Sequence, residues 1–128
     1  MAIYSTGAIE NRGRDMKSLT VRAANIGTAA GNVLLEVFHA LNAADGVSQQ
    51  VLYVQRLVSV APDQLHTFDN IFPDLDSVTV RVTTSDLGQA LIAVSVASRD
   101  AQRRVIPGFV STNPGRFDVP ERFPQGNE

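Results

Sequence analysis

The residues of this chain that could do chemistry are few, and their spacing suggests no familiar site. The two histidines, His39 and His66, lack a partner at the His-x-x-x-His or Glu-x-x-His spacing of a metal site. The chain also lacks the Gly-x-Ser-x-Gly turn that exposes a nucleophilic serine. We therefore interpret both histidines as structural. A Ser–His–Asp triad stays open as an alternative, because triads are recognised by geometry and imidazole is a common acid–base group near neutral pH.

Four oxygen-bearing side chains lie close together in the middle of the chain and could offer ligands to calcium. They are Asp69, Asn70, Asp74 and Asp76. Their order is not the Asp-x-Asp-x-Asp-Gly order of a calcium loop, and Asp and Asn are also the usual residues of turns. We interpret the group as a turn. The sequence predicts a protein that is not an enzyme, with no catalytic residue, cofactor or metal.

Composition narrows the class of protein further. The 128 residues are 44% hydrophobic, which suits one domain with a real core, and the absence of cysteine excludes disulfides and thiolate chemistry. Eleven basic and thirteen acidic residues leave a formal charge of -2, so we expect no nucleic-acid partner. No apolar run approaches the ~20 residues that span a bilayer, and we expect no membrane partner. The first residues lack the pattern of a secretory signal.

Short segments that alternate apolar and polar residues cover most of the chain, and they must position any site. In the clearest, Val78, Val80 and Val82 alternate with polar residues, which is typical of a strand with one buried face. Further strands are predicted over residues 18–25, 33–41, 50–60, 65–68, 90–97 and 103–110. Arg56 interrupts its strand, as at a bulge or an edge. The pattern predicts an all-β protein, a single antiparallel β-sandwich of about seven or eight strands, Ig-like or jelly-roll.

The two ends of the chain differ from this pattern. Residues 1–16 are expected to form an N-terminal arm with one short strand near residues 3–9, residues 17–110 the sandwich, and residues 111–128 a tail containing Pro and Gly. Apolar side chains in such ends need a partner. The expected assembly contacts are Ile3, Tyr4, Ile9, Phe117, Val119 and Phe123.

One stretch carries a resemblance to known proteins. TVRAANIGTAAGNVLLEVF, residues 20–38, is similar to the strand–Asn-x-Gly–strand hairpin of immunoglobulin-like adhesion domains, and the likeness extends over roughly residues 18–106. A compact sandwich with a Gly-containing arm and no signal peptide resembles small Firmicutes spore-surface proteins, including endospore appendage fibre subunits. That resemblance implies that residues 1–16 dock onto the next subunit and that lysis of the mother cell releases the fibres. Family members with cysteines in this connector form cross-links, which this chain cannot.

Physical reasoning predicts the same function. An extended arm can complete the sheet edge of a neighbour by β-augmentation, and head-to-tail contacts that do not close build filaments. We expect a structural subunit that binds copies of itself and forms a fibre, like a spore appendage or pilus, or a shell. The acceptor edge would lie near Gln55 and Arg56 or over residues 103–110. The alternatives are a virion protein that decorates a capsid or builds a tail, and a monomeric binding or adhesion module. We expect the protein to be located outside the cell, on a spore surface or in a virion, after cell lysis.

Overall fold

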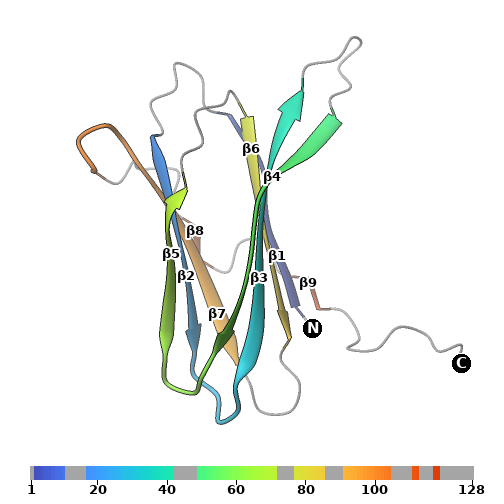
Figure 1. The fold of residues 1–128 in the computed structure, drawn as a ribbon, viewed down its shortest axis with the longest axis vertical. Helices are drawn as coiled ribbons and strands as arrows, with labels where there is room; N and C mark the ends of the chain where they lie inside the picture. Colours follow the sequence, from blue (N-terminus) through green and yellow to red (C-terminus); the bar gives the residue numbers. More distant parts are fainter. Residues whose placement is uncertain are drawn as a thin grey trace, which may run out of the picture.

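The computed structural model describes residues 2–10, 17–41, 49–71, 77–85, 91–104, 111–112 and 117–118. These residues form two antiparallel sheets that face each other (Figure 1). Their strands are β1 (Ala2–Glu10), β2 (Ser18–Asn25), β3 (Gly31–Leu41), β4 (Gln49–Val60), β5 (Leu65–Ile71), β6 (Ser77–Ser85), β7 (Ile92–Arg99), β8 (Ser111–Thr112) and β9 (Phe117–Asp118). The all-β antiparallel sandwich predicted from the sequence is confirmed.

The strands are divided unequally between the two sheets. One sheet has the order β4-β3-β6-β1-β9, and the other has the order β5-β2-β7-β8. The last member of each sheet, β9 or β8, contributes only two residues. Because β2 and β3 lie in different sheets, the chain crosses between the layers directly after its second strand.

The core lies between the sheets and follows from the alternation in the sequence. In β6 and β7 every second residue is buried, and the residues between them face outward. The buried residues of β6 and β7 include several valines, and burial of each valine side chain contributes about 1.5–3 kcal/mol to the stability of the fold. The larger side chains that are almost fully buried are Tyr4, Leu19, Val21, Val33, Leu35, Val37, Val60, Phe68, Ile71, Val78 and Val80.

The N-terminal segment differs from the expected arm, because residues 2–10 form β1 inside the five-stranded sheet. β1 pairs with β6 from Ala2 opposite Thr84 to Glu10 opposite Ser77. Tyr4 is buried in the core, and its hydroxyl donates a hydrogen bond to the carbonyl oxygen of Ile92 at 2.7 Å. Ile9 packs against the core as well. The interior of the domain itself therefore takes up Tyr4 and Ile9, two of the side chains that the sequence assigns to assembly, whereas Ile3 is not part of the core cluster.

A bulge explains why β1 has weak alternation in the sequence. The register with β6 shifts between Ser5 and Ala8, and Gly7 has a φ of 69°, in the region that favours glycine. The amide of Val80 donates to Oγ1 of Thr6 at 3.1 Å, which ties the bulge to β6. Core-facing positions are thus even-numbered before the bulge and odd-numbered after it, so the period-two pattern is broken.

The Asn-x-Gly segment forms a corner between the sheets, and the expected hairpin is therefore corrected. Asn25 ends β2, is almost fully buried, and uses its side chain at four places. Its Nδ2 donates to the carbonyl oxygens of Ala29 at 2.8 Å and Val60 at 3.0 Å. Its Oδ1 accepts from the amides of Gly27 at 2.9 Å and Leu91 at 3.3 Å. One amide thus joins the corner to the end of β4 and the start of β7.

The C-terminal strands lie on one side of the sandwich. β8 pairs with β7 through Ser95–Thr112 and Val96–Ser111, and β9 pairs with β1 through Ala2–Asp118 and Ile3–Phe117. One chain segment therefore touches both sheets. Of the expected tail contacts, Phe117 belongs to β9, whereas Val119 and Phe123 lie outside the described residues. Residues 101–104 form a turn, and the rest of the strand expected over residues 103–110 lies outside the described residues.

Substitutions at Tyr4 test whether β1 is part of the domain. Tyr4→Phe should lower the free energy of unfolding by about 1 kcal/mol, since it removes one buried hydrogen bond. Tyr4→Ala should lower it by about 4 kcal/mol, since it also leaves a cavity in the core. Urea unfolding followed by circular dichroism measures both, and an unchanged midpoint for Tyr4→Ala would contradict this placement of β1.

Asn25→Ala tests the corner between the sheets. The substitution leaves buried amide and carbonyl groups without their partner, and we expect a loss of about 3 kcal/mol or more in the free energy of unfolding. Asn32→Ala, at an exposed position of β3, is the matched control and should change it by less than about 0.5 kcal/mol. Similar urea midpoints for the two variants would show that the corner does not depend on Asn25.

Candidate functional site

The structure does not bring the two histidines together. His39 lies on β3 in one sheet, and His66 lies on β5 in the other. The His39 ring is edge-on to Tyr53, with 6.1 Å between centroids, and the His66 ring is edge-on to Phe68 at 4.6 Å. In the part of the chain that the structure describes, no three His, Asp or Glu side chains are grouped so as to hold a metal ion.

The acidic group singled out in the sequence is split by the fold. Asp69 and Asn70 belong to strand β5, where a turn was expected, and Asp74 and Asp76 lie outside the described residues. Oδ1 of Asp69 accepts a hydrogen bond from the hydroxyl of Thr20 at 3.4 Å. The strand position follows from the pairing of β5 with β2, which continues to Ile71 opposite Leu19.

The outer face of the five-stranded sheet carries an ion pair between a buried carboxylate and a partly exposed arginine. Glu36 on β3 is only 8% exposed although it faces away from the core. Nε and Nη2 of Arg81 donate to its Oε1 at 3.1 and 2.8 Å, and Nε2 of Gln55 donates to its Oε2 at 3.2 Å. The three residues are direct cross-strand neighbours. Both carboxylate oxygens are therefore bonded, as a carboxylate this well buried requires.

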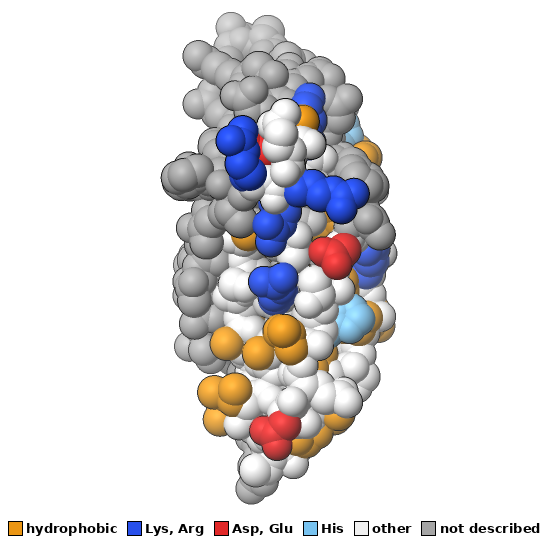
Figure 2. All heavy atoms as spheres, turned by 90° about the vertical axis from the view of Figure 1, so that its left-hand side faces the viewer, with side chains coloured by type: hydrophobic (Ala, Val, Ile, Leu, Met, Phe, Trp, Pro, Cys, Tyr) orange, Lys and Arg blue, Asp and Glu red, His pale blue; other side chains and the backbone are white. Residues whose placement is uncertain are grey.

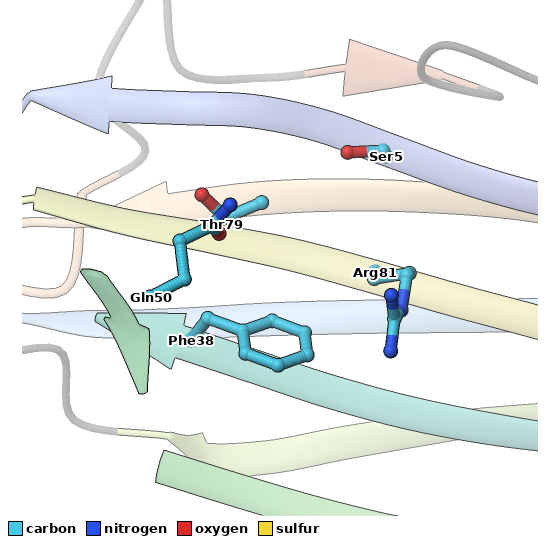
Figure 3. Close-up of a pocket in the computed structure, with 5 residues that line it drawn as sticks. All are labelled: Ser5, Phe38, Gln50, Thr79 and Arg81. Carbon is cyan, nitrogen blue, oxygen red and sulfur yellow. The ribbon is translucent and has the colours of Figure 1, made fainter. Parts of the chain in front are cut away.

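Beside this ion pair lies a shallow hollow of about 310 Å³. Figure 3 shows its lining, which is Ser5, Phe38, Gln50, Thr79 and Arg81. The guanidinium carbon of Arg81 is 4.8 Å from the centroid of the Phe38 ring, a cation–π contact that holds both side chains in place. The lining contains no paired nucleophile and base. The hollow presents an aromatic ring and polar side chains at the surface of this sheet.

Strand β4 continues this face to the edge of the sheet and exposes large apolar side chains there. Leu52, Tyr53 and Leu57 are between 44% and 68% exposed. Leu57 lies opposite Leu34, and Leu52 lies opposite Phe38. Two apolar rows thus run from the edge onto the face, one on each side of the row that contains Glu36 and Arg81.

The β4 edge is open, whereas on the opposite side of the sandwich the two-residue strands β8 and β9 pair with parts of β7 and β1. No described strand pairs with the outer side of β4, which has twelve residues. Its one charged residue, Arg56, lies at the break predicted to mark a bulge or edge, and its Nη1 donates to the carbonyl oxygen of Asp69 on β5 at 3.0 Å. Proteins usually shorten, charge or cover such edges, so a long and apolar open edge is a candidate interaction surface.

The acceptor edge predicted near Gln55 and Arg56 lies on β4, but the apolar residues of this strand were not predicted to form a contact. A signal was present, because Leu52 and Tyr53 are adjacent, as are Leu57 and Val58. Adjacent apolar residues place apolar side chains on both faces of a strand. That pattern alone does not separate a strand covered on both faces from one with an exposed face, and only the exposures of the side chains do so.

Comparisons with protein-family models, with curated proteins and with solved structures give no match to this chain. Among the described residues there is no helix long and apolar enough to cross a membrane. The surfaces of the domain therefore carry the argument about its function.

Substitutions of the ion pair test whether Glu36 depends on Arg81. Arg81→Gln should lower the free energy of unfolding by about 2 kcal/mol, because it removes a charged partner from a buried carboxylate. Glu36→Gln in the same chain should recover part of that loss, since a neutral amide needs no cation. Urea unfolding of both single variants and the double variant measures the coupling, and strictly additive losses would contradict it.

Proposed function

We propose that this protein is a non-enzymatic structural subunit that binds a second copy of itself through the open edge of β4. The observation that supports this is a twelve-residue edge strand with three exposed large apolar side chains and no described strand paired on its outer side. Addition of a strand would pair the outer backbone groups of β4 and bury these side chains.

The pattern of β4 favours a second copy as the partner, because the strand is complementary to itself in antiparallel order. Tyr53 and Leu57 are each two residues from Gln55 along β4. In a two-fold antiparallel pair centred on Gln55, Tyr53 of one copy therefore lies opposite Leu57 of the other, and the two Gln55 residues lie opposite each other. The two five-stranded sheets then become continuous.

A larger assembly needs a second contact, since a two-fold contact closes at two copies. The same proposal includes extension of the pair to a fibre, like a spore appendage or pilus, or to a shell. It also includes a location on a spore surface or in a virion after cell lysis. These finer points rest on the resemblance drawn from the sequence. The docking of residues 1–16 onto a neighbour is not retained, because β1 completes the core of its own domain.

Leu57→Lys tests the proposed edge. In a two-fold pair this change places two lysines in the contact, and we expect the dissociation constant to rise at least tenfold, roughly 1.4 kcal/mol. Sedimentation velocity over a concentration series measures it. Wild-type protein should approach twice the monomer mass of 13.8 kDa, and the variant should stay near the monomer.

Ile26→Lys is the matched control, because Ile26 is 71% exposed in the corner after β2, outside β4, and Leu57 is 68% exposed. It should behave as wild type. A chain that ends at Asp118 tests whether the contact is made by the β4 edge or by the residues after Asp118. It should also form the wild-type oligomer in sedimentation velocity. Wild-type protein that stays monomeric at every concentration, or equal effects of the two lysines, would exclude β4 as the contact.

A further inference from the structure

The outer face of the four-stranded sheet, which the proposed β4 contact does not use, carries an excess of positive charge. Arg22 on β2 is exposed, and Arg99 on β7 occupies an outward position of a strand whose alternate residues form the core. Lys17 directly precedes β2, and Arg103 and Arg104 follow β7. Figure 2 shows lysine and arginine side chains gathered over the middle and upper parts of this face.

The register brings these residues near one another. Ser18 lies opposite Arg99, and the amide of Lys17 donates to the carbonyl oxygen of Arg99 at 2.8 Å. The amide of Asp100 donates to the carbonyl oxygen of Arg104 at 2.9 Å, which folds the turn back onto the end of β7. Arg22 is four residues from Ser18 along β2, roughly 13 Å. The cations therefore form a band along β2 and β7.

Few carboxylates lie among these cations. Asp69 is on β5, beside Arg56. Asp100 accepts hydrogen bonds from the amides of Arg104 and Gln102 and from Nε of Arg104, and these bonds lower the pKa of Asp100. The carboxylate of Asp100 is thus hydrogen-bonded within the turn over residues 100–104. Along β2, β7 and the turn that follows β7 lie five of the seven lysines and arginines in the described residues, Lys17, Arg22, Arg99, Arg103 and Arg104, with Asp69 and Asp100 beside them. A third carboxylate, Asp63, is exposed at the apolar end of the face, where its amide donates to the carbonyl oxygen of Asn25 at 2.8 Å.

The same face ends in an exposed apolar cluster. Ile26, Leu65 and Leu91 are 57–71% exposed and make up half of the exposed large hydrophobic residues of the described chain. The amide of Ile26 donates to the carbonyl oxygen of Leu91 at 2.9 Å, and Leu65 lies opposite Ala24 on β2. Figure 2 shows hydrophobic side chains together toward the lower end of this face. Single exposed aliphatic residues are common on protein surfaces, but three at one end of a basic face form a patch.

Although the sequence predicts no membrane partner, we propose that this face binds the surface of a bilayer that contains anionic lipids. The cations contact the phosphate headgroups, and Ile26, Leu65 and Leu91 enter the boundary between headgroups and acyl chains. A bilayer surface offers negative charge and apolar depth side by side, which matches both parts of the face. A nucleic acid or an acidic polysaccharide would leave the three aliphatic side chains without a partner. The described part of this face also lacks an exposed Phe, Tyr or Trp on which bases could stack.

Vesicle co-sedimentation tests the proposal. The probes are vesicles of phosphatidylcholine alone and vesicles of an equal mixture of phosphatidylcholine and phosphatidylglycerol. The full chain should bind the mixed vesicles and not the neutral ones, and added salt should weaken the binding without abolishing it. Absence of binding to the mixed vesicles, or equal binding to both kinds, overturns the proposal.

Two charge variants locate the contact. Lys17→Gln with Arg22→Gln changes the net charge by -2 on the basic face. Asn32→Asp with Gln49→Glu changes it by the same amount at exposed positions of the other sheet. We expect the first pair to weaken binding to mixed vesicles at least about tenfold and the second by much less. Equal weakening by the two pairs would show that only the net charge matters.

A third variant, Leu65→Ser with Leu91→Ser, distinguishes binding to a bilayer from binding to a free polyanion. Both positions are exposed, so the fold should tolerate the change, which circular dichroism checks. The variant should lose the part of its vesicle binding that persists in added salt. Its affinity for heparin, a free polyanion, should stay unchanged. Unchanged binding to vesicles would identify the face as a polyanion site without lipid insertion. The Lys17/Arg22 variant should keep the wild-type mass in sedimentation, which distinguishes this inference from the β4 proposal.

Discussion

The hydrogen bonds of the Asn25 side chain are the constraint on which the arrangement of this domain depends. They join the end of β2, the corner that leads to β3, the end of β4 and the start of β7. A buried amide satisfied at all four places is rigid, and each lost bond would leave a buried group unpaired. At this corner the chain passes from β2 in one sheet to β3 in the other, so the same side chain connects strands of both sheets.

The consequences appear at the two sides of the sandwich and on its two faces. On one side the C-terminal strands β8 and β9 pair with β7 and β1, and on the other β4 remains open. One face carries the Glu36–Arg81 pair between apolar rows, and the other carries a band of cations that ends in an apolar cluster. The two proposed contacts lie on separate surfaces, so one copy could use both together.

Sequence and structure differ where local patterns are ambiguous. The bulge at Thr6 and Gly7 reverses the alternation of β1, which hides a core strand within what resembles an arm. Asn-x-Gly is compatible with a hairpin as well as a corner, and the choice depends on the partners of β2 and β3. The near-neutral composition gave no sign of a basic face, because net charge does not record where charges lie.

The sequence by itself determined the class of fold and the approximate positions of β1 to β7, and β2 begins and ends where the alternation predicts. The two-residue strands β8 and β9 were not predicted. Alternation and turn residues are local properties, so they can be seen without a partner. Only the tertiary structure decided the neighbours, edges and faces, because these join residues far apart in the chain. Tyr4 donates a hydrogen bond to Ile92, which is 88 residues away in the chain, and Arg81 donates one to Glu36, which is 45 residues away. The exposure of Leu57 and the clustering of Lys17 with Arg99 follow from the same long-range pairing, which no single segment encodes.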